Sequence, residues 1–342
     1  MLELGEFTID LSKLVDECKT KMPTRLAVQI PPALQRHSAE LSKAIADNCL
    51  VDVFMISRPS FGACDLPDFN KLKELGVDLL VNLGHTELPN IKSSYEEGMD
   101  IPVLFLEMPA EIEKVEIAPK DLKRLGKSVA LSATVQYVHL LPKVAEFLEE
   151  NDIQTHIGEG DGRIKYNGQV LGCNYTAVEN ISKKIDSHLF VGTGIFHPLG
   201  IALAVEKPVF ALDPHLGVVI NFEGHRERFL RKRFGLIEKA KASDKFGVVI
   251  CTKPGQLRKE VALESHEMLK KQDKTSVLFI SNELDPSDFD YSDIDVIVST
   301  ACPRIALDDS SRYKKPIITP LELKIALGEH SWEDYLPDSI KG

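Results

Sequence analysis

The stretch Leu26-Ala-Val-Gln-Ile-Pro-Pro-Ala-Leu-Gln35 decides the fold because its pattern occurs three times in the chain. The other copies are Val129-Ala-Leu-Ser-Ala-Thr-Val-Gln136 and Gly247-Val-Val-Ile-Cys-Thr-Lys-Pro-Gly-Gln256. Each copy is a short apolar run, a turn-like exit and a glutamine, and a helical pattern follows at residues 38–48, 138–150 and 257–271. Such repetition predicts three related modules.

Three more apolar runs follow the opening run of each module. They lie at residues 51–56, 77–82 and 101–106, then 153–157, 187–191 and 208–212, and finally 276–280, 294–298 and 316–319. Strands that alternate with helices form parallel sheets with right-handed crossovers. The sequence therefore predicts an α/β fold of three modules, 1–112, 113–222 and 223–342. Each is expected to hold a roughly four-stranded parallel sheet flanked by helices, and the three are expected to surround a central cleft.

Composition limits the function classes that remain open. The chain has 342 residues and a formal net charge of −11, which disfavours direct nucleic-acid binding because that needs a basic surface. No apolar run reaches the roughly 20 residues that span a bilayer, so no membrane association is expected. The start Met1-Leu-Glu-Leu-Gly-Glu-Phe7 lacks the basic and apolar regions of a signal peptide. We therefore expect a cytoplasmic protein, whose cysteines are more often free or metal-bound than paired.

Three of the six cysteines lie in loops beside small or turn-forming residues. Cys64 and Cys173 follow the second predicted strand of their modules, and Cys302 follows the third. Ligands of open α/β sheets bind beyond the carboxyl ends of the strands, so all three cysteines are placed at binding edges without being equivalent by register. Cys18, Cys49 and Cys251 lie in helical or strand patterns and are interpreted as structural.

Three thiolates around one centre would leave one coordination position open. A 4Fe-4S cluster whose fourth iron binds a small chelating ligand suits such a set. A zinc site remains the alternative, in a non-catalytic scaffold or assembly subunit, although structural zinc prefers four ligands in short-spaced pairs. The sequence has no Cys-x-x-Cys pair, and it does not select a fourth ligand among His85, His197 and His215.

Several other residues are candidates for binding a cofactor at the same edges. A glutamine recurs after each opening strand, Gly192-Thr-Gly194 permits close backbone approach after a strand, and an arginine follows the third loop cysteine. Each also has a structural interpretation, such as a helix start, a common glycine turn, a surface ion pair or a loop histidine. The candidates are Gln35, Gln136, Thr193, Gly194, His215, Gln256 and Arg304.

The segment His225-Arg-Glu-Arg-Phe-Leu-Arg-Lys-Arg233 is strongly basic in an acidic protein and begins a predicted helix that runs to about Ala242. Such segments are usually solvated helix faces. Steering of an anionic partner surface is the alternative interpretation.

Five segments resemble the archaeal diphthamide-synthesis enzyme family, and the resemblance runs over essentially the whole chain. They are Phe61-Gly-Ala-Cys64-Asp65, Gly168-Gln-Val-Leu-Gly-Cys173-Asn174, Ala301-Cys-Pro-Arg-Ile-Ala306 with Asp308-Asp309, Arg233-Phe-Gly-Leu-Ile-Glu-Lys-Ala-Lys241 and Thr252-Lys-Pro-Gly-Gln256. The resemblance implies three α/β domains that each give one cysteine, Cys64, Cys173 or Cys302, to a 4Fe-4S cluster. It implies no catalytic residue beyond the cluster.

The same resemblance implies a reaction and partners. It implies a noncanonical radical enzyme, a 2-(3-amino-3-carboxypropyl)histidine synthase that uses S-adenosylmethionine as cosubstrate. An electron from the cluster cleaves the bond between the sulfonium sulfur and the methionine γ-carbon. The 3-amino-3-carboxypropyl group passes to imidazole C2 of a histidine on translation elongation factor 2, the first step of diphthamide biosynthesis. The implied partners are this factor, a second copy of the chain in a homodimer, and an unidentified electron donor.

Overall fold

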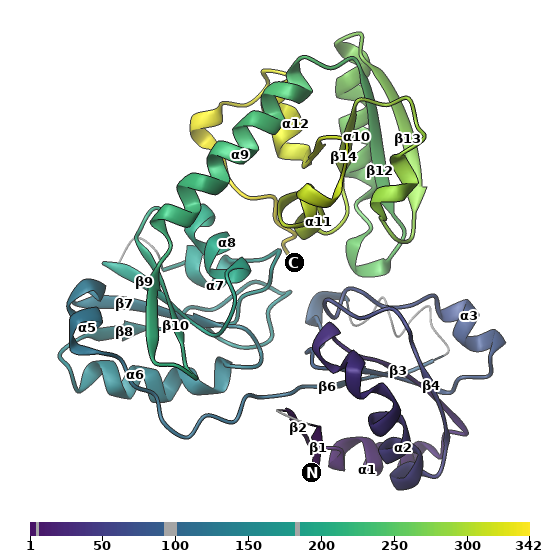
Figure 1. Ribbon diagram of the computed structural model, residues 1–342, viewed down its shortest axis with the longest axis vertical. Coiled ribbons are helices and arrows are strands. Elements are labelled where there is room, and N and C mark those ends of the chain that lie inside the picture. Colours follow the sequence, from purple (N-terminus) through teal and green to yellow (C-terminus); the bar gives the residue numbers. More distant parts are fainter. Residues whose placement is uncertain (5–6, 92–100, 182–184) are drawn as a thin grey trace. The chain divides into compact units, whose positions relative to one another are not determined.

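The computed structural model describes residues 1–4, 7–91, 101–181 and 185–342 and contains three mostly parallel sheets flanked by helices (Figure 1). The chain divides into two compact units. The first consists of Met1–Lys114, Val135–Leu140 and Lys253–Gly255, and the second of Val115–Thr134, Leu141–Thr252 and Gln256–Gly342. The predicted α/β class is confirmed. The three-module boundaries stay a prediction.

The first unit is built on a fully parallel sheet with the order β4-β3-β5-β6. Leu14, Leu41 and Val28 belong to one buried cluster, in which two helices and an N-terminal hairpin cover a face of the sheet. The elements are the hairpin β1 (Leu2–Leu4) and β2 (Phe7–Ile9), the strands β3 (Arg25–Gln29), β4 (Asp52–Met55), β5 (Leu79–Leu83) and β6 (Val103–Leu106), and the helices α1 (Ser12–Lys21), α2 (Ser38–Cys49) and α3 (Phe69–Glu74), with 3₁₀ turns η1 (Pro32–His37) and η2 (Pro89–Ile91).

The second sheet has five strands in the order β11-β10-β9-β7-β8, one more than predicted. The added strand β11 pairs antiparallel with β10 at the sheet edge, because the tight turn at Gly217, with φ of 65°, reverses the chain. The elements are β7 (Ser128–Ala133), β8 (Gln154–His156), β9 (Ser187–Val191), β10 (Val209–Asp213), β11 (Val218–Asn221), α5 (Pro119–Leu125), η3 (Val138–Leu140), α6 (Leu141–Glu149), α7 (Thr176–Glu179) and α8 (Phe196–Ala204).

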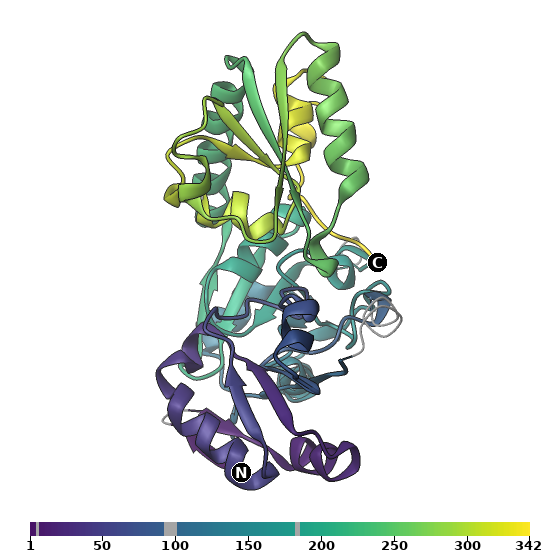
Figure 2. The same cartoon turned by 90° about the vertical axis from the view of Figure 1, so that its right-hand side faces the viewer.

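The third sheet is parallel, with the order β13-β12-β14-β15, and it is covered on both faces (Figure 2). Val296 and Val298 pack with α9, α10 and α12, whereas Ile297 between them packs with α11. This alternation is the two-residue period of a strand. The elements are α9 (Glu223–Lys241), β12 (Lys245–Cys251), η5 (Pro254–Gln256), α10 (Lys259–Lys271), β13 (Thr275–Ser281), η6 (Pro286–Phe289), β14 (Val296–Ser299), α11 (Pro303–Leu307), η7 (Asp309–Arg312), β15 (Ile317–Ile318), α12 (Pro320–Ala326) and η8 (Trp332–Asp334).

The four predicted strands of each module are arranged in the same order across its sheet. The second strand lies at the edge, and the first, third and fourth strands follow it. An aspartate directly before each third strand also recurs: Asp78, Asp186 and Asp295. Each carboxylate accepts two backbone N–H groups at the start of the first strand, at 2.6 and 3.1 Å from Thr24 and Arg25, 2.8 and 3.0 Å from Lys127 and Ser128, and 3.3 and 3.0 Å from Asp244 and Lys245. The strand order and this clamp support descent from one repeated unit.

A fully buried ion pair joins the helices around the third sheet. Arg233 of α9 donates from Nε and Nη2 to the Glu322 carboxylate of α12 at 2.7 and 2.5 Å, and both side chains are inaccessible to solvent. The remaining guanidinium donors reach the carbonyls of Ala306 in α11 and Ile317 in β15, so one side chain connects four elements. Arg233 begins one of the segments that carried the family resemblance.

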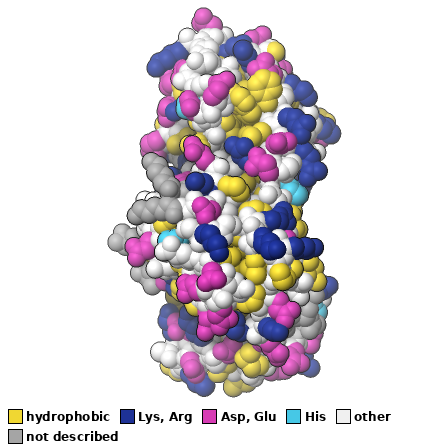
Figure 3. All heavy atoms as spheres, turned by 90° about the vertical axis from the view of Figure 1, so that its left-hand side faces the viewer, with side chains coloured by type: hydrophobic (Ala, Val, Ile, Leu, Met, Phe, Trp, Pro, Cys, Tyr) yellow, Lys and Arg dark blue, Asp and Glu magenta, His cyan; other side chains and the backbone are white. Residues whose placement is uncertain are grey.

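Part of the basic charge of α9 is balanced by acidic residues of the same helix. Arg226 pairs with Glu223, and Arg231 pairs with Glu227, at helical spacing. On the face shown in Figure 3, basic and acidic side chains are interspersed. These pairs favour the solvated-face interpretation of this segment over the steering interpretation.

Within the described part of the chain, none of the helices combines the length and the apolar composition needed to cross a lipid bilayer.

Replacement of Arg233 by Met should destabilise the protein by about 3–5 kcal/mol, because it leaves the Glu322 charge buried without its partner. Chemical denaturation measures the change. Arg231→Met on the exposed side of the same helix is the control and should change the free energy of unfolding by less than about 1 kcal/mol. Equal effects of the two substitutions would contradict this role for Arg233.

The Asp78 clamp should make stability depend on pH. Hydrogen bonds from the Thr24 side chain and backbone hold the pKa of Asp78 below its usual value. The stabilisation is therefore complete above the unfolded pKa of about 3.9 and is lost as the pH falls through the lowered folded pKa. Asp78→Asn should lower the urea midpoint at neutral pH, and the gap to the parent protein should close in acid. A difference in urea midpoint that does not depend on pH would exclude the clamp. Asp16→Asn, in an exposed pair of α1, is the control.

Candidate metal centre

Cys64 lies in the loop after β4, in the first unit. Ser60 and Asp65 shape this loop. The Ser60 hydroxyl and the Asp65 N–H both donate to the carbonyl of Gly62, at 3.1 and 2.9 Å, and the N–H of Phe61 donates to the Asp65 carboxylate at 3.1 Å. A Cβ atom on Gly62 would lie 3.5 Å from the Cys64 sulfur. The loop is thus folded back on itself and keeps small residues beside the thiol.

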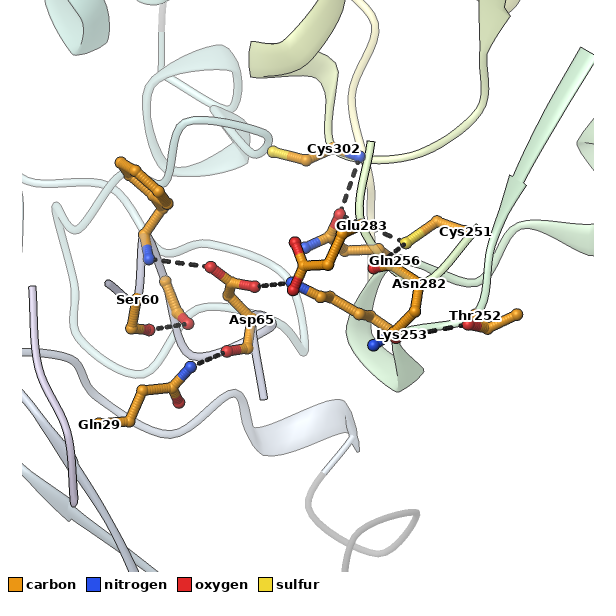
Figure 4. Close-up of polar contacts among 12 residues, drawn as sticks. Gln29, Ser60, Asp65, Cys251, Thr252, Lys253, Gln256, Asn282, Glu283 and Cys302 are labelled. Carbon is orange, nitrogen blue, oxygen red and sulfur yellow. Dashed lines mark hydrogen bonds and ion pairs between the residues drawn. The ribbon is translucent and has the colours of Figure 1, made fainter. Parts of the chain in front are cut away.

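A buried polar network supports the loop from the ends of β3 and β5. Gln29 donates from Nε2 to the carbonyl of Asp65 at 2.6 Å (Figure 4). Asn82 donates from Nδ2 to Gln29 Oε1 at 3.0 Å. His85 Nδ1 lies 2.9 Å from Asn82 Oδ1. Burial lowers the pKa of His85 to about 4, against the opposing charge of Asp65. His85 is therefore neutral at physiological pH, with its Nδ1 proton directed at Asn82.

Cys173 lies in the second unit, in a turn closed by backbone hydrogen bonds between Leu171 and Asn174. Its side chain is buried, which raises the pKa of the thiol, and the charge and hydrogen bond of Arg163 oppose that rise. The neighbouring Gly172 has no room for a side chain, since a Cβ there would lie 2.4 Å from the ring of Phe196. The thiol is thus held in an enclosed, locally cationic environment.

The segment 336–342 forms a strap over the Cys173 turn. Ile340 donates its N–H to the carbonyl of Cys173 at 2.7 Å, and its own carbonyl accepts from Asn174 Nδ2 at 3.1 Å. Farther back, Asp338 accepts two hydrogen bonds from the Arg258 guanidinium at 2.6 and 3.0 Å. This bidentate pair anchors the strap to the residue that precedes α10.

Cys302 directly precedes α11, in the second unit, at the carboxyl end of β14. The buried Gln256 accepts its N–H through Oε1 at 3.2 Å and also accepts a weak bond from the Cys251 thiol at 3.8 Å (Figure 4). Tyr175 connects this loop with the preceding one. Its hydroxyl donates to Gly172 at 3.0 Å, and its pKa is raised by burial and then by the charges of Cys173 and Cys302. The two loops also approach each other directly, since a Cβ on Gly172 would lie 3.3 Å from Cδ of Arg304.

Arg304 belongs to α11, and its guanidinium lies 4.1 Å from the centre of the Phe196 ring. It also pairs with Asp308 at 2.9 Å. His197, the next residue of α8, is packed against Phe190, and burial together with Arg304 lowers its pKa to about 3. The predicted ion pair of Arg304 exists, and the guanidinium face is used by an aromatic ring.

The other candidates from the sequence occupy different environments. Gln35 lies in η1, and its Nε2 is buried and has no hydrogen-bond partner among the described residues. Gln136 donates from Nε2 to the carbonyl of Gly84 at 2.7 Å within the first unit. Thr193 and Gly194 form an exposed turn after β9, where a Cβ on Gly194 would meet nothing within 4 Å. His215 lies in the exposed turn after β10.

The chemistry of the donors fits an iron–sulfur group. The thiol donors are soft, and in the second unit they are accompanied by Arg163, glycine and buried aromatic groups that suit a large anionic cluster. Cys64 belongs to one unit and Cys173 with Cys302 to the other. Across residues 1–4, 7–91, 101–181 and 185–342, the structure gathers no group of three or more His, Cys, Asp or Glu side chains around a single metal position.

Sequence reasoning did not single out several residues that build these loops. Asp65, Arg163, Lys253, Arg258 and Asp338 were all missed as site residues. Asp65 and Lys253 lie inside segments that carried the family resemblance, which was the available signal. Arg163, Arg258 and Asp338 act through tertiary contacts, and no local pattern marks them.

Parallel sheets flanked by helices, with cysteine loops that follow their strands, define an α/β protein, and comparison with known proteins identifies the family. Residues 30–337 match the family described as "Putative diphthamide synthesis protein". A relative from Pyrococcus horikoshii named 2-(3-amino-3-carboxypropyl)histidine synthase is 36% identical over 339 residues, covering 98% of this chain and 94% of the relative. The chain belongs to the diphthamide synthesis protein family, which confirms the resemblance.

Other relatives and solved structures agree with this assignment. The 2-(3-amino-3-carboxypropyl)histidine synthase of Methanocaldococcus jannaschii is 35% identical over 306 residues, covering 86% of this chain and 79% of the relative. The crystal structure of Dph2 from Pyrococcus horikoshii superposes with a TM-score of 0.85 at 34% identity, covering 98% of this chain and 94% of that one. A second crystal structure of that protein contains a 4Fe-4S cluster and matches equally well.

The strap predicts that Cys173 is protected by the Arg258–Asp338 pair. Arg258→Gln should release the strap and increase the labelling rate of Cys173 by a thiol reagent several-fold in the cluster-free protein, because local opening becomes easier. Peptide mass spectrometry follows Cys173 against Cys49 in the same chain. Lys314→Gln, in an exposed pair with Asp290, should leave the ratio unchanged. An unaltered Cys173 rate in Arg258→Gln would show that the pair does not hold the strap.

Proposed function

We propose that this protein transfers the 3-amino-3-carboxypropyl group of S-adenosylmethionine to imidazole C2 of a histidine on translation elongation factor 2, the first step of diphthamide biosynthesis. The observation that carries the proposal is the match, over 98% of the chain, to a Dph2 crystal structure that contains a 4Fe-4S cluster. The shared name of the relatives supplies the transferred group and the acceptor residue type.

In this proposal Cys64, Cys173 and Cys302 hold three irons of a 4Fe-4S cluster and leave the fourth iron to S-adenosylmethionine. The bound cluster supplies the electron that cleaves the bond between the sulfonium sulfur and the methionine γ-carbon, as in a noncanonical radical enzyme. The three predicted modules each contribute one cysteine loop. Burial of Cys173 and Tyr175 supports the exclusion of water from the cluster side.

The chain's own residues have distinct roles in this scheme. Gln256 fixes the backbone at Cys302 through its amide oxygen, and Gln136 fixes the turn at Gly84. The exposed Thr193-Gly194 turn and Arg304 are proposed to contact S-adenosylmethionine, because backbone amides and a guanidinium recognise its carboxylate. The same role is proposed for Gln35 and His215.

The proposed partners follow from the reaction. Elongation factor 2 is the protein substrate, an electron donor reduces the cluster, and the chain acts as a homodimer in the cytoplasm. The net charge of −11 supports the proposal that nucleic acid is not bound directly. We also propose that the protein does not associate with a membrane, because no apolar run of the sequence reaches the length that spans a bilayer.

Replacing the three cysteines tests the cluster directly. After anaerobic reconstitution, the parent chain should be brown and hold about four irons. Cys64→Ala, Cys173→Ala and Cys302→Ala should each lose most of that iron and all release of methylthioadenosine in the presence of reductant and elongation factor 2. Cys49→Ala, at the end of α2, is the matched control and should behave like the parent.

The alternative hypothesis, a non-catalytic scaffold that binds zinc, predicts the opposite results in the same experiment. A zinc protein would be colourless, would contain no sulfide and would release no methylthioadenosine. Full activity in any one of the three cysteine variants would refute its assignment as a ligand.

A further inference from the structure

The residue that follows Cys64 takes part in a buried ion pair within the first unit. Lys253 Nζ contacts Asp65 Oδ1, and the two side chains are only 7% and 11% exposed (Figure 4). The other carboxylate oxygen, Oδ2, accepts the N–H of Phe61, and the Asp65 carbonyl accepts from Gln29. The pair is therefore attached to the loop on both sides of the Cys64 thiol.

The turn that carries Lys253 also contacts Cys64 itself. Gly255, two residues later, approaches so closely that an added Cβ would lie 2.5 Å from the Cys64 Cβ and 2.7 Å from its Cα. Only glycine fits between the two backbones. Lys253, Pro254 and Gly255 all belong to the same compact unit as Cys64. The turn thus gives the cysteine loop both a charge partner and a steric support.

We propose that Lys253 and Asp65 form a charge-compensated clamp that positions Cys64 and sets the reduction potential of the cluster. The inference rests on the proposed function, since it takes Cys64 to be a cluster ligand. Reduction adds one negative charge to the cluster, so a nearby cation favours the reduced state and a nearby anion disfavours it. The intact pair has no net charge, and removal of either partner leaves one charge beside the ligand loop.

A purely structural pair predicts a different pattern. A pair that only held the loop in shape would, on losing either partner, loosen Cys64 in the same way and change the cluster in the same direction. A charge clamp predicts opposite shifts in potential from the two single substitutions and compensation when both are combined. The sign of the shift in midpoint potential therefore distinguishes a charge clamp from a purely structural pair, whatever stability each variant loses.

The experiment compares Lys253→Met, Asp65→Asn and the double variant as reconstituted full-length chains. Midpoint potentials are measured by a redox titration followed by electron paramagnetic resonance. Asp65→Asn should raise the potential, Lys253→Met should lower it, and the double variant should return close to the parent value. Lys253→Arg keeps the charge and should remain near the parent.

Iron retention provides a second readout that is independent of turnover. Loss of iron to a chelator should be roughly 10–100-fold faster in either single variant, the usual consequence of losing a group that supports a metal ligand. Lys245→Met, in an exposed pair with Asp293, is the matched control and should match the parent in both potential and iron loss.

The outcomes separate this inference from the proposed function. Shifts of equal sign, or potentials and iron loss equal to the parent in both single variants, would overturn the charge clamp while leaving the enzyme assignment intact. A parent chain that binds no cluster after reconstitution would instead overturn the proposed function, and with it the premise of the clamp.

Discussion

The contact between Arg233 and Glu322 fixes the part of the molecule on which the third cysteine loop depends. A guanidinium with no solvent access needs hydrogen-bond partners and an opposite charge to be stable, and here four hydrogen bonds reach α12, α11 and β15 from α9. Because Ala306 lies one helical turn after Cys302, this constraint determines where α11 begins and therefore where the thiol lies. The pairing of this buried charge thus supports the helix that begins directly after Cys302.

The core of the fold was predictable from the sequence because its central strands are covered on both faces. The twelve apolar runs coincide with the strands β3 to β10 and β12 to β15. Central strands such as β5, β9 and β14 are buried along their whole length, an environment that demands nearly continuous apolar residues. The edge strand β11 was missed because only Val219 of its Val218-Val-Ile-Asn221 run is buried. The short hairpin β1–β2 was missed because three-residue strands leave little periodicity.

The candidate site was predictable only where residues act locally. The three cysteines are marked by their loops, and the family resemblance extends to Asp65 and Lys253 without revealing that these two residues meet. Their separation in sequence is 188 residues, so no window along the chain can report the pair. Arg258 with Asp338 is a similar case. The glutamine at the end of each opening segment was recognised as recurrent, but the bonds of Gln136 and Gln256 to backbone atoms were not.

The aspartate clamps have a consequence for how the sequence of such a protein can evolve. Asp78, Asp186 and Asp295 fasten the amino ends of their sheets in the same manner, whereas the cysteines lie on loops at the carboxyl ends. In each module, the aspartate therefore holds the amino end of the sheet, while the loops at the carboxyl end can change in sequence without disturbing it. If the three modules descend from one ancestral unit, this division is consistent with a shared architecture in which Cys64 and Cys302 follow different strands. An ancestral scaffold of this kind can acquire a reactive centre piece by piece.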